Sequence, residues 1–104
     1  MLVYKLLRPD EWASFDANGT FAGSFADLRD GFIHLSTNEQ VDRTFAKHFS
    51  DAVNVMLITL DSDHFDAALR WEASRGGALF PHLYRALDRS DIVKVVPFQP
   101  GTPA

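Results

Sequence analysis

The stretch 30–37 places one histidine in a setting that suits chemistry. It reads DGFIHLST, a turn dipeptide followed by a short apolar run and by hydroxyl residues that can begin a helix. If residues 32–36 form a strand, Phe32, His34 and Ser36 share one of its faces. A titratable imidazole on a rigid strand suits a binding or catalytic site. The simpler alternative for His34 is a partly buried ring bonded to a neighbouring carbonyl, and for Ser36 it is a helix cap.

A second stretch adds a carboxylate and an indole ring. Trp71 and Glu72 are adjacent in a run that predicts a strand over 70–74, so they point to opposite faces. Glu72 is a candidate general base or a ligand of ribose hydroxyls, and Trp71 is a candidate ligand contact. The simpler alternative is a core tryptophan with a solvated glutamate next to Arg70.

A third stretch, FPHLYR at 80–85, combines three polar side chains with a rigid backbone. His82 and Tyr84 share a face if the stretch is extended, and Pro81 restricts the backbone just before them. Arg85 carries the fork of donors that suits a phosphate group. This combination is unusual for a plain core strand and favours a site.

We expect these separate stretches to converge on one cleft, because each polar residue has neighbours that already account for the core. The predicted catalytic side chains are His34, Glu72 and His82. The predicted ligand contacts are Lys5, Ser36, Trp71, Tyr84 and Arg85.

The sequence does not predict a metal site. His48 lies on the apolar stripe of a predicted helix and suits packing, whereas His64 lies at a polar helix start and suits exposure. A three-histidine site from His34, His48 and His82 would lack metal-type spacing. The chain also lacks a glycine-rich phosphate loop, a G-x-S-x-G elbow and an H-E-x-x-H motif.

The composition limits the classes of protein to which this chain can belong. Its 104 residues suit one globular domain, and the absence of cysteine excludes disulfides, thiol catalysis and cysteine-ligated zinc. The net charge of −4 argues against general nucleic-acid binding. The segment 67–87, however, contains three arginines, Arg70, Arg75 and Arg85, and only one acidic residue, Glu72. This local excess of positive charge suits an anion site. No apolar run reaches the roughly 18–20 residues of a membrane span, and no signal-peptide pattern begins the chain, so we expect a cytoplasmic protein.

The hydrophobic pattern predicts a mixed α+β fold of five to six strands and two main helices. Lys5 should share a face with Val3 and Leu7. Residues 20–30 read as a loop that can include a short strand. The run 53–60, apolar throughout its centre, should be a central strand covered on both faces. The other predicted strands are 2–7, 32–36, 70–74, 79–87 and 92–98. Three helices are predicted. The first covers 9–18, and a short third one covers 61–69. The second begins after a capping box at 36–40 and carries Val41, Phe45, His48 and Phe49 on one face. The domain spans 1–98, and 99–104 is a flexible tail.

The motifs Tyr4-Lys5, 30–36, Trp71-Glu72 and 80–84 occur in this order in a small bacterial family, domain-of-unknown-function family 952, which the chain resembles over nearly its whole length. That family in turn looks like a compact member of the ADP-ribosyltransferase superfamily. The stretch 32–36 is similar to the second motif of RNA 2′-phosphotransferases, in which a histidine followed by Leu-Ser opens a helix.

This resemblance implies an ADP-ribosyltransferase-like fold with a compact mixed or antiparallel split sheet. It also implies NAD as a substrate and a role for His34 in holding NAD or its ribose. Two positions depart from the superfamily pattern. Lys5 stands where an arginine or histidine is usual on the first strand, and the strand around His82 carries no glutamate. Glu72 would have to replace that glutamate from a neighbouring strand.

Two functions therefore compete. The first is a pocket for NAD, ADP-ribose or a related nucleotide, with weak transferase activity at most. The alternative is a non-catalytic sensor or interaction module for another small anionic metabolite or a protein partner. The sequence carries no signal for an oligomeric state.

Overall fold

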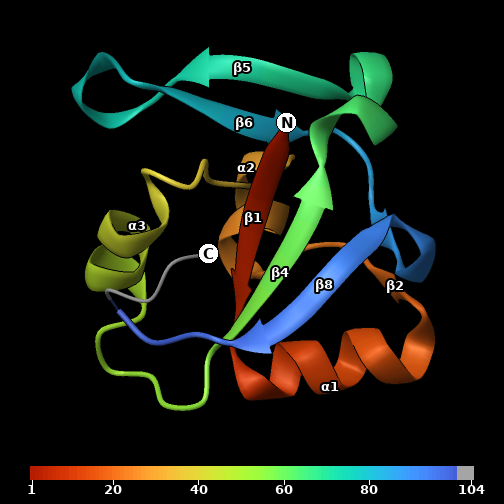
Figure 1. The fold of residues 1–104 in the computed structure, drawn as a ribbon. Coiled ribbons are helices and arrows are strands. Elements are labelled where there is room, and N and C mark those ends of the chain that lie inside the picture. The colour runs from red at the N-terminus through yellow and green to blue at the C-terminus, as the bar shows by residue number, and fades with distance from the viewer. Residues whose placement is uncertain (101–104) are drawn as a thin grey trace.

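The strand β4, Met56–Asp61, lies at the centre of the main sheet. A computed structural model describes residues 1–100, apart from the side chain of Arg75. β4 pairs antiparallel with β1, Leu2–Leu7, and with β8, Ile92–Pro97. These three strands cross the middle of the molecule in Figure 1. Both faces of β4 are covered, which confirms the central strand predicted from the sequence.

Two smaller sheets complete the β structure, and all strand pairs are antiparallel. In the larger of them β6 lies between β3 and β5, and in the smaller one β2 pairs with β7. The strands are β2 (Thr20–Phe21), β3 (Ile33–His34), β5 (Leu69–Ala73), β6 (Leu79–Leu83) and β7 (Leu87–Asp88). An isolated bridge between Tyr4 and Ser36 connects the main sheet to the sheet of β3. This bridge is what brings the stretch 33–36 alongside β1.

Three α-helices and four 3-10 turns connect the strands. The α-helices are α1 (Pro9–Asn18), α2 (Phe25–Asp30) and α3 (Val41–His48), and the 3-10 turns are Ser62–His64, Asp66–Ala68, Arg75–Gly77 and Arg89–Asp91. α1 has the predicted bounds, because Pro9 suits the first turn and Gly19 takes the left-handed conformation, φ 79°, that ends it.

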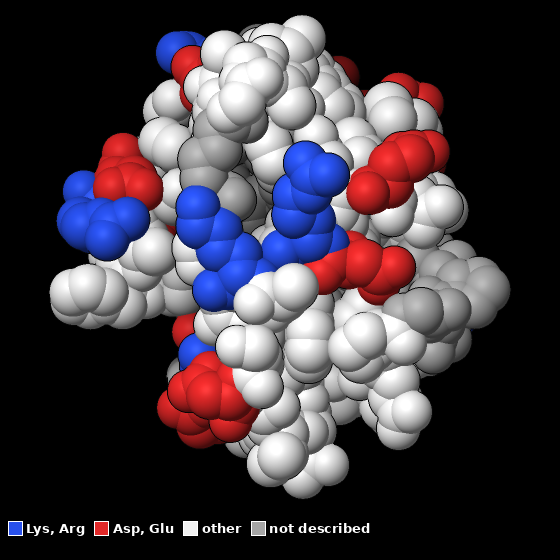
Figure 2. All heavy atoms as spheres, turned by 90° about the vertical axis from the view of Figure 1, so that its left-hand side faces the viewer, with Lys and Arg blue, Asp and Glu red and all other residues white. Residues whose placement is uncertain are grey.

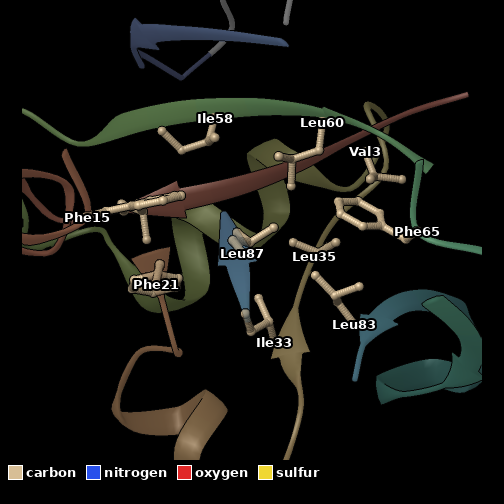
Figure 3. Close-up of a cluster of buried hydrophobic side chains, with 11 residues drawn as sticks. Val3, Phe15, Phe21, Ile33, Leu35, Ile58, Leu60, Phe65, Leu83 and Leu87 are labelled. Carbon is tan, nitrogen blue, oxygen red and sulfur yellow. The ribbon is translucent and has the colours of Figure 1, made fainter. Parts of the chain in front are cut away.

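The main sheet separates two groups of buried apolar side chains. One face of β1 carries Val3 and Leu7, which pack with side chains from α1, β3, β6 and β7 (Figure 3). The other face carries Tyr4 and Leu6, which pack against Val41 of α3. Lys5 follows the alternation and lies on the face of Val3 and Leu7, as predicted, although it is a charged residue.

The prediction of a loop with a short strand over 20–30 is right for the short strand, β2, but wrong for the rest, because the segment also contains the helix α2. Ser24 and Asp27 form a capping box at the start of α2, and Gly31, with φ 86°, ends the helix. A helix of six residues spans less than two turns, so it carries almost no hydrophobic periodicity. Asp30-Gly31 is therefore the end of a helix and not a hairpin turn.

The predicted count of five to six strands and two main helices is also corrected, to eight strands and three α-helices within residues 1–100. The run 79–87 is divided into β6 and β7, because the backbone bends at Tyr84 and Arg85, after the N–H of Tyr84 has donated to the carbonyl of Ala68 at 2.7 Å. No parallel pair occurs among the described strands, so the mixed arrangement is excluded there.

The strand predicted over 32–36 is shorter in the structure, where β3 covers only Ile33–His34. Three further differences from the prediction have local reasons. β4 begins at Met56 and not at Val53, since Asn54 has a positive φ of 58°. α3 begins at Val41, because Thr37 and Gln40 close a turn of their own, with the N–H of Thr37 donating to Oε1 of Gln40. The segment 61–69 forms two 3-10 turns in place of one helix.

Of the predicted tail, residues 101–104 lie outside the described residues. Within residues 1–100, no helix is both long enough and apolar enough to cross a membrane.

Candidate functional site

Asp27 is buried beneath the site and connects three segments of the chain. Its side chain is 1% exposed. Lys5 Nζ lies 2.9 Å from Oδ2, the backbone N–H of His34 donates to Oδ1 at 3.0 Å, and the N–H of Ser24 donates to Oδ2 at 2.8 Å. Burial opposes ionisation of Asp27, but the hydrogen bonds from His34 and the charge of Lys5 outweigh it and hold the pKa of this carboxyl well below its usual range. Asp27 is therefore a fixed negative charge that joins α2 to β1 and β3.

His34 is held between two carboxylates of α2. Its Nδ1 lies 2.7 Å from Oδ1 of Asp27, and its Nε2 lies 3.0 Å from Oδ2 of Asp30. The His34 side chain is 37% exposed, so the ring is fixed and still accessible. Hydrogen bonds from Arg29 and then from His34 lower the pKa of Asp30. The ring orientation of His34 is thus set from both sides.

A second histidine–carboxylate pair lies on the neighbouring strands. Nδ1 of His82 is 2.8 Å from Oε1 of Glu72, and the hydroxyl of Tyr84 donates to the same oxygen at 2.7 Å. The hydrogen bond from Tyr84, with the one from His82, lowers the pKa of Glu72, and the same contact with Glu72 raises the pKa of Tyr84. The guanidinium of Arg70 lies over the Tyr84 ring, 4.5 Å from its centre.

Phe32 joins the two pairs into one cluster. Its ring centre lies 4.5 Å from that of His34, 4.0 Å from that of His82 and 5.4 Å from that of Tyr84. His34 and His82 are directly opposite on β3 and β6, with ring centres 5.7 Å apart. His34, His82, Tyr84 and Glu72 therefore lie in one cluster, but of the four only the two histidines line a common cavity.

Only part of this cluster faces the main cavity, which has a volume of about 330 Å³. Its wall includes both histidines of the cluster, the first turns of α1 and α2, and one side of α3. The lining residues are Lys5, Arg8, Glu11, Ser24, Phe25, Ala26, Asp27, Arg29, His34, Leu35, Ser36, Thr44, His48, Phe49, Ser74, Phe80 and His82.

Cations and anions alternate around the cavity. Arg8 lies 3.5 Å from Asp51 and donates to the carbonyl of His48, while Arg29 forms an exposed pair with Asp30. Figure 2, which views the side of the molecule that carries α3, shows Lys and Arg side chains next to Asp and Glu side chains. This face has no broad positive surface, and its positive charge is local.

Two predicted ligand contacts line the cavity, but both have partners within the protein. Lys5 is buried in its pair with Asp27, and its Nζ also donates to the carbonyl of His34 at 3.1 Å. Ser36 is buried too, and its hydroxyl lies 3.0 Å from that of Thr44 on α3. Ser36 is therefore not the cap of a helix, since α3 begins five residues later.

The other predicted contacts lie away from the main cavity. Trp71 faces the opposite side of β5 from Glu72 and borders a separate hollow with Ser62 and Asp63. Arg85 makes a two-point ion pair with Asp91 at 2.9 Å, and its guanidinium stacks on Phe65. Its hydrogen bonds to Asp91 raise the pKa of Arg85 further. The structure thus gives Arg85 a structural partner, set by the turn at 88–91.

Tyr84 and Glu72 belong to the histidine cluster but do not line the main cavity. Tyr84 lines an adjoining hollow with Phe32, and Glu72 contacts the ring of His82 without lining the main cavity. Glu72 therefore orients a histidine, whereas the sequence suggested direct contact with a ligand.

Of the two remaining histidines, His48 differs from its prediction and His64 agrees with its prediction. His48 is exposed and lines the cavity, so its predicted role in packing is wrong. His64 is exposed as predicted, and its Nε2 lies 3.0 Å from Asp91. Across residues 1–100, no group of three or more histidine and acidic side chains is arranged to hold a metal ion.

Sequence reasoning missed Asp27, Asp30, Arg29 and Phe25, all of which belong to α2. The signal for α2 was present, since Ser24 and Asp27 have the spacing of a capping box. A lysine on the apolar face of β1 also required a buried carboxylate as its partner. Which carboxylate would meet Lys5 depended on how α2 packs.

Proteins with known structures resemble this chain over most of its length. The crystal structure of protein CC0527 from Caulobacter crescentus has 44% sequence identity and a TM-score of 0.90, covering 100% of this chain and 94% of that one. The solution NMR structure of CC0527 has 47% identity and a TM-score of 0.83, covering 92% and 83%. Among proteins with curated descriptions, none matches this chain. The family model described as "Protein of unknown function (DUF952)" matches residues 6–95, and the chain belongs to this family.

Proposed function

We propose that the cavity beside His34 binds a small anionic ligand that carries an aromatic ring, such as NAD, ADP-ribose or a nucleoside phosphate. The composition of the cavity wall carries this proposal. Two arginines, an exposed phenylalanine ring and an oriented imidazole face the same space.

The arginines suit the anionic part of such a ligand. Arg8 and Arg29 lie at the rim, and their acidic partners Asp51 and Asp30 are also partly or fully exposed. Exposed ion pairs contribute only about 0–1 kcal/mol, so a phosphate group can replace them at little cost. The guanidinium fork matches two oxygens of a phosphate.

Phe25 suits the aromatic part of the ligand. It is the first residue of α2 and is 83% exposed, although it is a large apolar ring. A ring of this kind at the edge of a cavity can stack on a base. The volume of about 330 Å³ is near the lower end of the 300–1,000 Å³ typical of ligand pockets. A nucleotide-sized group therefore fits inside, and a dinucleotide would extend across the rim.

The likeness to ADP-ribosyltransferases supports a ligand of the NAD type. Its basis in this chain is the position of His34 on a short strand that is bridged to β1 through Tyr4 and Ser36. The contacts of the other polar residues favour binding over efficient transfer. Lys5 is occupied by Asp27, and Glu72 is occupied by His82 and Tyr84.

A thermal-shift titration with ADP-ribose, NAD and AMP tests the proposal. A ligand that binds only the folded state stabilises it by RT ln(1 + [L]/Kd), so the melting temperature of the wild type should rise with ligand concentration. Arg29→Gln and Phe25→Ala should reduce that shift, and His34→Ala should abolish it while the unliganded protein stays folded. Lys94→Gln is the matched control, because it removes one positive charge from β8, away from the cavity, and should keep the full shift.

Calorimetry supplies the contradicting outcome. If no adenine nucleotide produces heat at millimolar concentration, the nucleotide ligand is wrong. The alternative, a sensor or interaction module for a different anionic metabolite or protein partner, would then be favoured.

A further inference from the structure

Two histidines face each other across β3 and β6, His34 in contact with two carboxylates and His82 with one. We propose that His34 and His82 act as an acid–base pair that cleaves a phosphodiester bond beside a free hydroxyl, as found in a ribonucleotide. This inference rests on the proposed function, because the same cavity must first bind the nucleotide. It concerns chemistry that none of the superfamily motifs in this chain assigns to the pair.

The geometry holds the two rings at a fixed spacing. Their centres are 5.7 Å apart, and Phe32 packs against both. The backbone positions are direct cross-strand partners, so neither ring depends on a loop for its place. A phosphate group that lies in the cavity beside the two imidazoles can touch both at once.

His34 is suited to be the acid. Both of its ring nitrogens have a carboxylate oxygen within 3.0 Å, from Asp27 at Nδ1 and from Asp30 at Nε2. Both contacts are satisfied when both nitrogens carry protons. Asp27 is buried, so its contact with Nδ1 remains when a substrate binds. Asp30 is partly exposed, so an oxygen of the substrate can replace it as the partner of Nε2.

His82 is suited to be the base. Glu72 accepts a hydrogen bond from Nδ1, which leaves Nε2 as the lone-pair nitrogen of the neutral ring. The contact between the His82 ring and Glu72 is made by Nδ1, and the ring lines the cavity, so Nε2 is the nitrogen left for a substrate. Glu72 and Tyr84 act as positioning residues, since they fix the tautomer and orientation of His82 from outside the cavity.

The step balances without any co-reactant. The 2′-oxygen of the ribose forms a bond to phosphorus while its proton passes to Nε2 of His82. The bond from phosphorus to the 5′-oxygen breaks, and that oxygen takes a proton from Nε2 of His34. The products are a 2′,3′-cyclic phosphate and a free 5′-hydroxyl, and solvent then restores the two histidines to their starting states. Arg29 at the rim can stabilise the added negative charge on phosphorus in the transition state.

The test uses adenylyl-(3′,5′)-adenosine and its 2′-deoxy analogue, which can bind but lacks the attacking hydroxyl. The wild type should convert the ribonucleotide to adenosine 2′,3′-cyclic phosphate and adenosine, with a bell-shaped pH–rate profile. His82→Gln and His34→Asn should each reduce the rate by about a hundredfold or more, the size expected for loss of a general acid or base. Glu72→Gln should reduce kcat at unchanged KM, and Lys94→Gln, purified in parallel to control for contaminating nuclease, should match the wild type.

The deoxy analogue separates this inference from the proposed function. If the analogue binds but the ribonucleotide is not cleaved, the acid–base inference is wrong and the binding proposal stands. If neither compound binds and none is cleaved, both are wrong. Cleavage that persists in both histidine variants, whose folding is checked by their melting temperatures, would also overturn the inference.

Discussion

At the scale of single residues, the site depends on a carboxylate whose side chain is almost completely buried in the wall of the cavity. Asp27 is buried, yet it stays charged because Lys5 and His34 supply a cation and two hydrogen bonds. Removing one partner of such a pair leaves the other as an uncompensated charge in a low-dielectric region. The strict geometry of His34 therefore has its origin beneath the cavity.

Asp27→Asn should destabilise the protein by about 3–5 kcal/mol, the usual cost of breaking a buried ion pair from one side. Chemical denaturation of both proteins gives this difference in the free energy of unfolding. Asp30→Asn is the matched control, since Asp30 also contacts His34 but is partly exposed, and it should cost much less. Equal losses in the two variants would show that burial of Asp27 is not what matters.

The same residue predicts the response of stability to acid. The pKa of Asp27 is lower in the folded protein than in the unfolded chain, where the pKa of an aspartate is about 3.9. Its contribution to stability is fully present above that value and is lost as the pH falls from about 4 toward the folded pKa. Unfolding free energies measured between pH 7 and pH 2.5 should decline below about pH 4 in the wild type. The decline should be smaller in Asp27→Asn, and parallel curves would contradict the assignment.

Alternation along the strands is why much of the site could be predicted from sequence. His34 and His82 were placed on one cleft because Ile33 and Leu83 account for the core on the other faces of their strands. Trp71 and Arg85 could not be excluded in the same way. The partner of Arg85, Asp91, is set by a turn that follows β7, and such long-range pairings leave no periodic pattern.

At the scale of elements, α2 shows where pattern reasoning fails. α1, β1, β4 and β8 have apolar residues at helix or strand spacing, and each was predicted within a few residues. α2 has only six residues, and two of its apolar side chains, Phe25 and Leu28, are exposed. The sequence signals for α2 are at its two ends, in the capping box and in Gly31. No hydrophobic periodicity connects these two signals, so they do not by themselves predict a helix.

The central position of β4 leads to a prediction for folding. Ile58 is fully buried between β1 and β8, so Ile58→Asp should prevent folding, since an unpaired charge in the core costs several kcal/mol. Circular dichroism and thermal melting check this directly. Val93→Asp places the same charge on β8 at a position that is 59% exposed, and it should fold normally. A folded Ile58→Asp variant with native melting would contradict the central role of β4.

At the scale of the whole molecule, the cavity lies where two sheets and three helices meet. The bridge between Tyr4 and Ser36 joins the main sheet to the sheet that carries both histidines, while α2 and α3 contribute to the wall on either side. Figure 1 shows the pair β5–β6 separate from the main sheet, with α3 at one side and α2 behind β1. Residues from distant parts of the chain therefore form one site.

This arrangement predicts weak or absent ADP-ribosyl transfer. Breaking the nicotinamide–ribose bond creates positive charge on the sugar, and a carboxylate nearby must stabilise it. Glu72 is held by His82 and Tyr84 away from the main cavity, and losing one such electrostatic contact costs on the order of a hundredfold in rate. Nicotinamide release from NAD, with and without 2′-phosphorylated RNA, should be slow in the wild type. A turnover of about one per second in the wild type, lost in both Glu72→Gln and His34→Ala, would contradict this prediction.

The most direct test of the central claim is a crystal structure of the protein grown with ADP-ribose. We expect ligand density in the cavity, with an oxygen of the ligand within hydrogen-bond distance of Nε2 of His34 and a phosphate group at Arg29. The adenine ring should lie against Phe25. Density for ADP-ribose elsewhere on the molecule, or an empty cavity at saturating ligand, would contradict the claim that this cavity is a nucleotide site.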